Sequence, residues 1–218
     1  MLTIPVLEGC LVRLEPLAPS HSPGLAAAAA GDRSTFGYTH LPDGVAAAER
    51  YVSAALADGA TGRSACYAVR HLPTGKIAGS TRFLDLEVFA APGAGSYGST
   101  GPAPDDDHPP TVAEIGGTWY SANLQGSGVN AATKLLLLCH AFEVWKVLRV
   151  CLKTDVRNER SRRAIAGIGA KFEGIRRIHM PSADGGVRDS AYFSVIASEW
   201  PEVKALLLAR TAAVAPPR

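Results

Sequence analysis

The chain has 218 residues, of which 47% are hydrophobic and 19% are charged, and its formal net charge is +2. This composition is typical of a globular protein with a sizeable core, so we expect one soluble domain over residues 1–218. The longest strongly apolar run, Leu135 to Phe142, is far shorter than the ~18 residues of a membrane-spanning helix. The N-terminal segment also lacks the pattern of a secretory signal. We therefore expect no membrane partner and no export.

The cysteines and histidines do not follow any metal-binding or disulfide pattern. The four cysteines have no CxxC spacing, and the six histidines are isolated from one another. We expect no metal site and no disulfide framework, which favours the reducing cytoplasm as the location.

Basic residues gather in one part of the chain. From Lys146 to Arg177 there are ten Lys and Arg against three acidic residues. A nucleic-acid surface would add stacking aromatic residues, and only Phe172 falls in the basic segment. We therefore expect a small anionic ligand and no nucleic acid.

Hydrophobic periodicity predicts strands and helices in an order that identifies the fold class. Strands are expected at 10–17, in a hairpin within 65–87, and at 111–120, 149–155, 171–177 and 189–196; helices are expected at 20–30, 45–58, 125–143, 158–170 and 199–210. The order is an antiparallel meander followed by a βαβ-like unit. It predicts a mixed α+β fold with a mostly antiparallel sheet, not a doubly wound one.

Residues 90–110 are rich in Gly, Ala, Ser and Pro and end in three aspartates, Asp105 to Asp107. A loop this long inside a compact domain is functional or disordered. We expect a mobile insertion that contributes to the choice of the second substrate, with the aspartates attracting a cationic amine.

Two glycines, Gly126 and Gly128, precede the helix of 125–143. Glycines at a helix N-terminus let backbone N–H groups approach a ligand, and the helix dipole favours an anion, so this segment predicts a phosphate site. Lys134, one turn further along, is expected to add positive charge.

The segment from Gly126 to Ala131 also matches the dinucleotide-binding pattern G-x-G-x-x-G/A, with Asp155 as a candidate ribose ligand. That site needs a tight turn from strand to helix, whereas four residues, 121–124, intervene here. It also needs several further βα units, and about one remains. An NAD(P) oxidoreductase is therefore the less favoured interpretation.

The same segment, Gln125-Gly126-Ser127-Gly128-Val129-Asn130, resembles the Q/R-x-x-G-x-G/A pyrophosphate loop of GNAT-superfamily acyltransferases. The resemblance continues through Glu114-Ile115-Gly116, Asn158-x-x-Ser161-Arg162-Arg163 and Gly169-Ala170-x-Phe172-Glu173-Gly174, and covers about 10–200. It is similar to the branch that acetylates the N-terminal amines of ribosomal proteins. The resemblance implies a sheet splayed between its fourth and fifth strands and an acyl-CoA cosubstrate without a metal.

The resemblance also implies roles for individual residues. Glu114 matches the general base of some members, and Ser161 is the candidate donor to the leaving thiolate. The residues expected to bind the cofactor are Trp119, Tyr120, Gln125, Gly126, Ser127, Gly128, Val129, Asn130, Ala131, Asn158, Ser161, Arg162 and Arg163. Backbone N–H groups near Trp119 and Tyr120 would stabilise the oxyanion.

Two positions depart from the family pattern. Asn130 stands where the family has Gly or Ala, and Ile165 stands where some members have a tyrosine that protonates the thiolate. Asn158 alone could be a plain helix N-cap, and Arg162 and Arg163 a solvated face. His140 and Tyr192 fit core or surface packing better than catalysis.

The sequence therefore predicts a CoA-dependent N-acyltransferase that acts by direct attack. The acyl group, acetyl or succinyl, stays open, as does the amine acceptor: a protein N-terminus, a lysine or a small-molecule amine. A catalytically silent CoA- or nucleotide-binding module is the alternative from another class. A homo-oligomer is possible.

Overall fold

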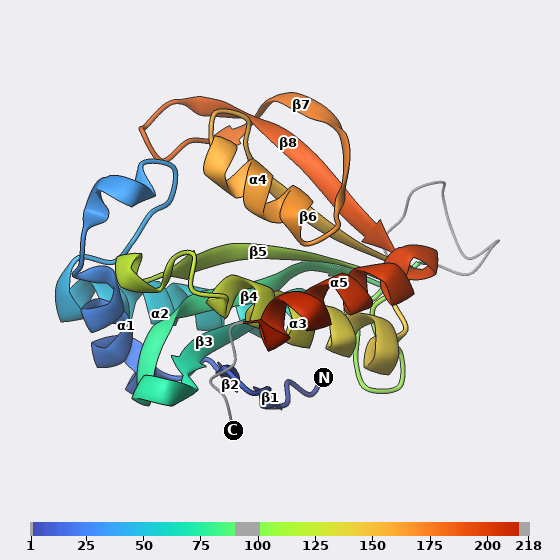
Figure 1. Ribbon diagram of the computed structural model, residues 1–218, viewed down its shortest axis with the longest axis horizontal. Helices are drawn as coiled ribbons and strands as arrows, with labels where there is room; N and C mark the ends of the chain where they lie inside the picture. The colour runs from blue at the N-terminus through green and yellow to red at the C-terminus, as the bar shows by residue number, and fades with distance from the viewer. Residues whose placement is uncertain (1, 90–100, 214–218) are drawn as a thin grey trace.

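The computed structural model describes residues 2–89 and 101–213 (Figure 1). Its centre is an eight-stranded sheet in the order β1-β2-β3-β4-β5-β6-β8-β7. The strands are β1 (Leu7–Glu8), β2 (Val12–Pro16), β3 (Ala65–His71), β4 (Lys76–Glu87), β5 (Val112–Tyr120), β6 (Arg149–Asp155), β7 (Lys171–Pro181) and β8 (Val187–Ile196). All neighbouring pairs are antiparallel except β5 and β6. The predicted α+β class with a mostly antiparallel sheet is confirmed.

Five α-helices cover the sheet: α1 (Ser22–Ala29), α2 (Gly44–Ala60), α3 (Val129–Cys139), α4 (Glu159–Gly167) and α5 (Trp200–Ala212). All five were predicted. The helix of 125–143 begins later than expected, because Gly126 and Gly128 adopt positive φ angles of 77° and 85° that end the preceding turn. It then continues as a π-helical turn, His140–Trp145. Periodicity did not reveal β1, because two residues are too few to show alternation.

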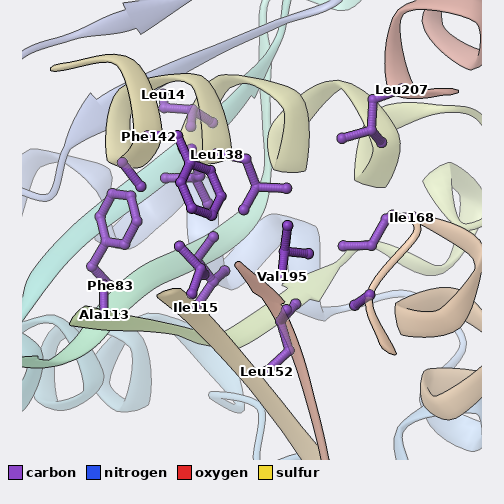
Figure 2. Packing of buried hydrophobic residues seen from close by; sticks show 14 of the residues in the cluster. Leu14, Phe83, Ala113, Ile115, Leu138, Phe142, Leu152, Ile168, Val195 and Leu207 are labelled. Carbon is purple, nitrogen blue, oxygen red and sulfur yellow. The ribbon is translucent and has the colours of Figure 1, made fainter. Parts of the chain in front are cut away.

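Helices cover both faces of the sheet. On one face α3 and α5 enclose the larger core, whose residues include Leu14, Phe83, Leu138, Leu152 and Leu207 (Figure 2). On the other face α1 and α2 enclose a smaller cluster that includes Leu25, Val52 and Trp119. Because the side chains of a strand alternate between faces, a central strand such as β3 or β5 contributes to both clusters.

β5 and β6 separate after a short paired stretch. They pair only at Val112–Arg149, Ala113–Val150 and Glu114–Cys151, whereas β5 continues to Tyr120 and β6 to Asp155. On their outer sides, β5 stays paired with β4, and β6 stays paired with β8, along almost the whole length of each strand (Figure 1). The predicted splay is confirmed; β5 and β6 are the fourth and fifth strands of the prediction, because β1 adds one to the count.

The insertion expected at 90–110 falls largely outside the described residues, since 90–100 are not described. Residues 101–110 contain no helix or strand. Asp106 accepts hydrogen bonds from the backbone N and the hydroxyl of Thr3, both at 2.7 Å, and Asp105 accepts from the backbone N of Asp107 and of His108. The carboxylates of Asp105 and Asp106 therefore already accept hydrogen bonds from the chain itself.

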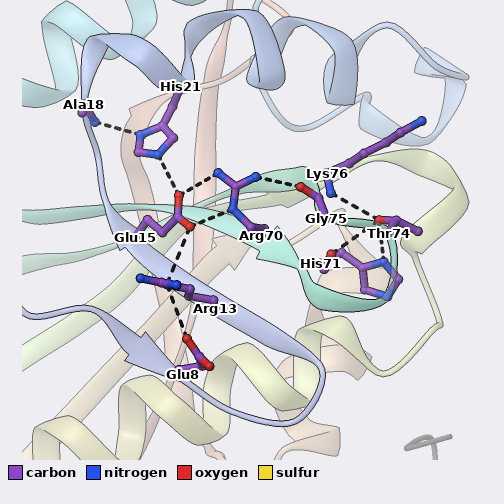
Figure 3. Close-up of polar contacts among 10 residues, drawn as sticks. All are labelled: Glu8, Arg13, Glu15, Ala18, His21, Arg70, His71, Thr74, Gly75 and Lys76. Atoms are coloured by element: carbon purple, nitrogen blue, oxygen red, sulfur yellow. Dashed lines mark hydrogen bonds and ion pairs between the residues drawn. The ribbon is translucent and has the colours of Figure 1, made fainter.

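A half-buried carboxylate ties the start of α1 to the sheet (Figure 3). Glu15 on β2 accepts two hydrogen bonds from Arg70 on β3, at 2.7 and 2.9 Å. His21, just before α1, lies 3.0 Å from the same carboxylate through Nε2, while its Nδ1 accepts from the backbone N of Ala18. The Nδ1 contact fixes the proton on Nε2, so His21 donates to Glu15. Hydrogen bonding from Arg70 lowers the pKa of Glu15 from 4.5 to about 2.

Glu15→Gln should destabilise the fold at pH 7 by about 1–3 kcal/mol, because hydrogen bonds to a charged group are lost. The folded-state pKa of Glu15 is depressed, so its stabilisation is present above about pH 4.5 and is lost as the pH falls towards 2. Urea unfolding at pH 7 and at pH 3 should therefore show a smaller difference between wild type and variant at the lower pH.

Glu8→Gln is the matched control for Glu15→Gln. Glu8 faces Arg13 at 3.4 Å, but its side chain is 56% exposed, so its loss should change stability by less than about 0.5 kcal/mol. Equal effects of the two substitutions would contradict the role assigned to Glu15.

Candidate active site in the splay of the sheet

The separation of β5 from β6 opens a cleft of about 670 Å³. β5 lines it from Glu114 to Tyr120, β6 contributes Leu152 to Thr154, and α4 closes one end. Of the residues predicted to form the site, Glu114, Trp119, Tyr120, Gln125, Gly126, Asn130, Asn158 and Ser161 line this cleft. The fold therefore brings most of the predicted residues together.

The glycine loop presents free backbone donors at one end of the cleft. Gly128 is the N-cap of α3 in the left-handed conformation, and Ser127 closes the preceding turn by donating its hydroxyl to the carbonyl of Leu124 at 2.6 Å. Within the described part of the chain, the backbone N–H groups of five residues donate no hydrogen bond: Gly126, Gly128, Val129, Asn130 and Ala131. Unpaired N–H groups at a helix N-terminus are suited to bind an anion.

Side chains of the loop have different surroundings. Val129 is fully buried in the core, so its side chain does not contact a ligand in the cleft. The carboxamide oxygen of Asn130 accepts a hydrogen bond from the hydroxyl of Tyr120 at 3.4 Å. Asn130 therefore links α3 to β5.

The prediction missed Arg160 on α4, a cation that contacts Gln125 at the start of the loop. Its Nη1 donates to the side-chain oxygen of Gln125 at 2.7 Å, and its Nη2 donates to the carbonyl of Thr35. Arg160 lies in the basic segment that the sequence singled out, but the motif pointed to Arg162 and Arg163. Helical spacing explains the difference, since a shift of two residues moves a side chain to another face.

Arg162 and Arg163 do not line the cleft. Arg162 donates to the carbonyl of Val156 at 3.3 Å, and Arg163 pairs with Glu159 one turn earlier at 3.2 Å. Both border a separate surface hollow with Phe172 and Phe193.

Asn158 and Ser161 begin α4 at the mouth of the cleft. Asn158 is the N-cap, and its side-chain oxygen accepts the N–H of Ser161 at 3.0 Å. The hydroxyl of Ser161 makes no hydrogen bond with the described part of the chain, and Ile165 lies one turn further on the same wall. The cap thus orients Ser161 towards the cleft and leaves its hydroxyl available.

Glu114 is the carboxylate at the apex of the splay. It is 3% exposed, and its Oε2 accepts from Nζ of Lys153 on β6 at 2.7 Å, while its Oε1 is buried without a partner in the described part of the chain. Burial raises the pKa of the Glu114 carboxyl, and the Lys153 ammonium opposes that rise. A desolvated carboxylate with one free oxygen in a cleft is suited to accept a proton.

Lys134 on α3 lines the cleft. It is 5% exposed, and its Nζ donates to the hydroxyl of Thr118 at 2.8 Å, which in turn contacts Thr81 at 2.8 Å. Burial lowers the pKa of Lys134 to about 7. The expected addition of charge is therefore partial at neutral pH.

Trp119 and Tyr120 lie on the free edge of β5 with their side chains on opposite faces. The ring of Trp119 belongs to the α1–α2 cluster and that of Tyr120 to the α3 core. Just before them the register with β4 shifts, and Gly117 has a φ of 55°. Such a bulge changes the direction of the β5 backbone, so that the unpaired edge of this strand can contact a ligand.

Other expected or rejected sites can be placed as well. His140 is buried against Phe83 and Trp145, so it is a packing residue, as predicted. Asp155, the alternative ribose ligand, is 1% exposed and bonded to Arg157 at 2.7 Å. In residues 2–89 and 101–213 no cluster of His, Cys, Asp and Glu could hold a metal, and no helix is long and apolar enough to cross a membrane.

Comparison with known proteins agrees with this geometry. Residues 12–171 match the family model described as an acetyltransferase (GNAT) domain. No significant match was found among curated proteins. A GCN5-related N-acetyltransferase from Brucella melitensis is 28% identical with a TM-score of 0.78, over 97% of this chain and 86% of that one.

Two further structures extend the comparison. A provisionally assigned acetyltransferase from T. thermophilus is 32% identical with a TM-score of 0.75, over 96% of this chain and 99% of that one. RimJ from Mycobacterium smegmatis, solved in complex with CoA-disulfide, shares the fold at 18% identity with a TM-score of 0.71, over 94% and 92% of the two chains. The chain therefore belongs to the GNAT acetyltransferase family, whose members use acyl-coenzyme A as the acyl donor.

Proposed function

We propose that this protein transfers an acyl group from acyl-CoA to a primary amine by direct attack. The observation that carries the proposal is the splayed edge of β5, which joins an anion-binding loop at one end to a desolvated carboxylate at the other. A thioester lying along this edge would present its carbonyl carbon beside Glu114.

The glycine loop would hold the pyrophosphate of CoA through the free N–H groups of 126–131, and Arg160 and Gln125 would add contacts at its side. The pantetheine arm would lie along Trp119 and Tyr120 and pass Asn158 and Ser161 on α4. Arg162 and Arg163 are the candidates for the ribose phosphate, which would then lie outside the cleft.

Acyl transfer needs a base, an oxyanion site and a proton for the thiolate. Glu114 would take a proton from the amine, whose nitrogen forms the new C–N bond at the thioester carbon. Backbone N–H groups near Trp119 and Tyr120 would stabilise the oxyanion. The C–S bond then breaks, and Ser161 would give its proton to the sulfur and regain one from water.

An acyl-enzyme intermediate is not part of this proposal. Cys151 is the cysteine nearest Glu114, its partner in the β5–β6 pairing, and burial raises the pKa of its thiol to about 12. Burial also raises the pKa of Cys139. Thiols that resist ionisation are poor nucleophiles, whereas holding the amine beside the thioester can supply about 7 kcal/mol or more.

Acetyl-CoA is the donor that we expect, with succinyl-CoA as the alternative. Thermal shift and thiol release measured with a panel of acyl-CoA thioesters would identify the donor. All four cysteines are free thiols, which suits the reducing cytoplasm that we propose as the location.

Gly128→Glu should lower CoA affinity by about a hundredfold or more, because like-charge juxtaposition costs several kcal/mol. Gly128 has a φ of 85°, so any side chain is also strained there. Gly128→Ala carries the same strain without the charge and is the control. Calorimetry should show a much larger loss for Glu than for Ala, and equal losses would remove the phosphate from the loop.

Glu114→Gln should lower kcat by about a hundredfold, within the usual contribution of a general base, and leave CoA affinity unchanged. Wild-type activity should rise with pH through the pKa of Glu114, because the base must be ionised. The Gln variant should lack this rise.

Lys153→Gln tests the role of Glu114 as the base by removing its ion-pair partner. The Lys153 ammonium favours the ionised carboxylate, so its loss should raise the pKa of Glu114 and move the rise in activity to higher pH. Full turnover in Glu114→Gln would contradict the role of Glu114 as the base, and CoA binding without turnover of any amine in the wild type would favour the silent binding module instead.

A further inference from the structure

The wall of the cleft formed by β4 and α2 contains a hydrogen-bonded group that the chemistry above does not use. Arg82 on β4 and Tyr51 on α2 both line the cleft, and so does Trp119. The guanidinium of Arg82 lies over the ring of Tyr51 at 5.5 Å, and the rings of Tyr51 and Trp119 meet edge to face at 6.3 Å. The three side chains therefore hold one another in place.

The hydroxyl of Tyr51 receives two hydrogen bonds. Nη2 of Arg82 donates to it at 3.2 Å, and Nε1 of Trp119 donates to it at 3.3 Å. A phenol oxygen that accepts from two donors must direct its own proton elsewhere. Among the described residues no acceptor receives that proton, so Tyr51 presents an oriented donor to the cleft.

Arg82 has little compensation for its charge. Its Nε is buried without a partner in the described part of the chain, and its side chain is 14% exposed. Asp58 lies 3.7 Å from Nη1, beyond hydrogen-bond distance, and is 66% exposed. An exposed carboxylate at that distance neutralises a buried guanidinium weakly, because solvent screens the pair.

Two unpartnered atoms lie against neighbouring glycines of the β5 bulge. A Cβ at Gly116 would lie 3.0 Å from Oε1 of Glu114, and a Cβ at Gly117 would lie 2.8 Å from Nε of Arg82. The absence of a side chain at both glycines therefore lets the buried carboxylate and the buried guanidinium approach the β5 backbone closely. One wall offers a proton acceptor and the adjacent wall offers donors.

The net charge of the side chains that line the cleft is positive. Among the described lining residues there is one carboxylate, Glu114, and the basic side chains are Arg82, Lys153, Arg160, Arg188 and the partly charged Lys134. The loop end, with Arg160, accounts for the phosphates of CoA. At the Glu114 end, Lys153 is paired with Glu114 at 2.7 Å and with Asp85 at 3.5 Å, whereas Arg82 has, within the described residues, only the exposed Asp58 at 3.7 Å.

We propose that the acceptor is a small amino carboxylate, whose amine contacts Glu114 and whose carboxylate is bound by Arg82 and the hydroxyl of Tyr51. This inference rests on the proposed function and names its acceptor. A carboxylate fits better than the neutral carbonyl of a peptide N-terminus, because a guanidinium binds an anion with charge-assisted hydrogen bonds.

The test compares acceptors that differ only at the carboxylate. With the acyl-CoA that turns over, thiol release is measured for glycine, β-alanine, glycinamide and ethylamine. The amino acids should give a kcat/KM at least about tenfold above glycinamide and ethylamine, since hydrogen bonds to a charged group are lost with the last two. An equal or higher kcat/KM for glycinamide, or for a peptide amine, overturns the proposal.

Variants locate the carboxylate. Tyr51→Phe should raise KM for glycine by about five- to tenfold with little change in kcat, and should leave the KM for ethylamine unchanged. Arg82→Gln should remove the preference for amino acids, and Arg82→Lys should restore part of it. Equal changes for glycine and ethylamine in Tyr51→Phe would show a merely structural role and contradict the assignment.

A binding measurement separates this inference from the proposed function. Calorimetry with glycine is carried out on the wild type and on Tyr51→Phe, each saturated with CoA. Binding that weakens in Tyr51→Phe supports the inference even if no amine is turned over, a result that would refute only the proposed transfer. Turnover of amines without any preference or Tyr51 dependence would refute only the inference.

Discussion

The parting of β5 from β6 is the constraint on which the site depends. Three residue pairs join the two strands, and beyond Glu114 their facing edges do not pair with each other. Unpaired backbone N–H and C=O groups away from water are costly, so this opening is stable only where a ligand or solvent can satisfy it. β4 and β8 hold the two halves of the sheet on their outer sides, which lets the opening persist without loss of the fold.

The two faces of the sheet serve the opening differently. On the α3 face, the helix N-terminus and Lys134 place positive charge below the β5 edge, and the large core fixes α3 in position. On the other face, α2 holds Tyr51 against Arg82 and Trp119, and Glu15 fastens the start of α1 to β2 and β3. In the proposed reaction, the cofactor and the acceptor would approach one thioester position from opposite faces of the sheet.

Much of the fold could be read from the sequence, because the strands alternate and the helices have apolar faces with clear ends. The loop of 125–131 and Glu114 could be proposed as site residues from the sequence, because each belongs to a short motif whose residues are close together in the chain. Arg160, Tyr51 and Arg82 could not, because their partners are distant in sequence: Arg82 meets Tyr51 from 31 positions away, and Arg160 meets Gln125 from 35. Such contacts depend on how α2 and α4 pack, and no spacing rule encodes them.

The central claim is that CoA occupies the opening along β5 with its pyrophosphate on the glycine loop. Hydrogen exchange measured by mass spectrometry, with and without saturating CoA, tests it most directly. The account predicts slower exchange in peptides that cover 115–120 and 126–131, whether or not the hollow between Phe172 and Phe193, which Arg162 and Arg163 border, is protected as well. Protection confined to that hollow, or tight CoA binding that leaves 115–120 unprotected, would contradict it.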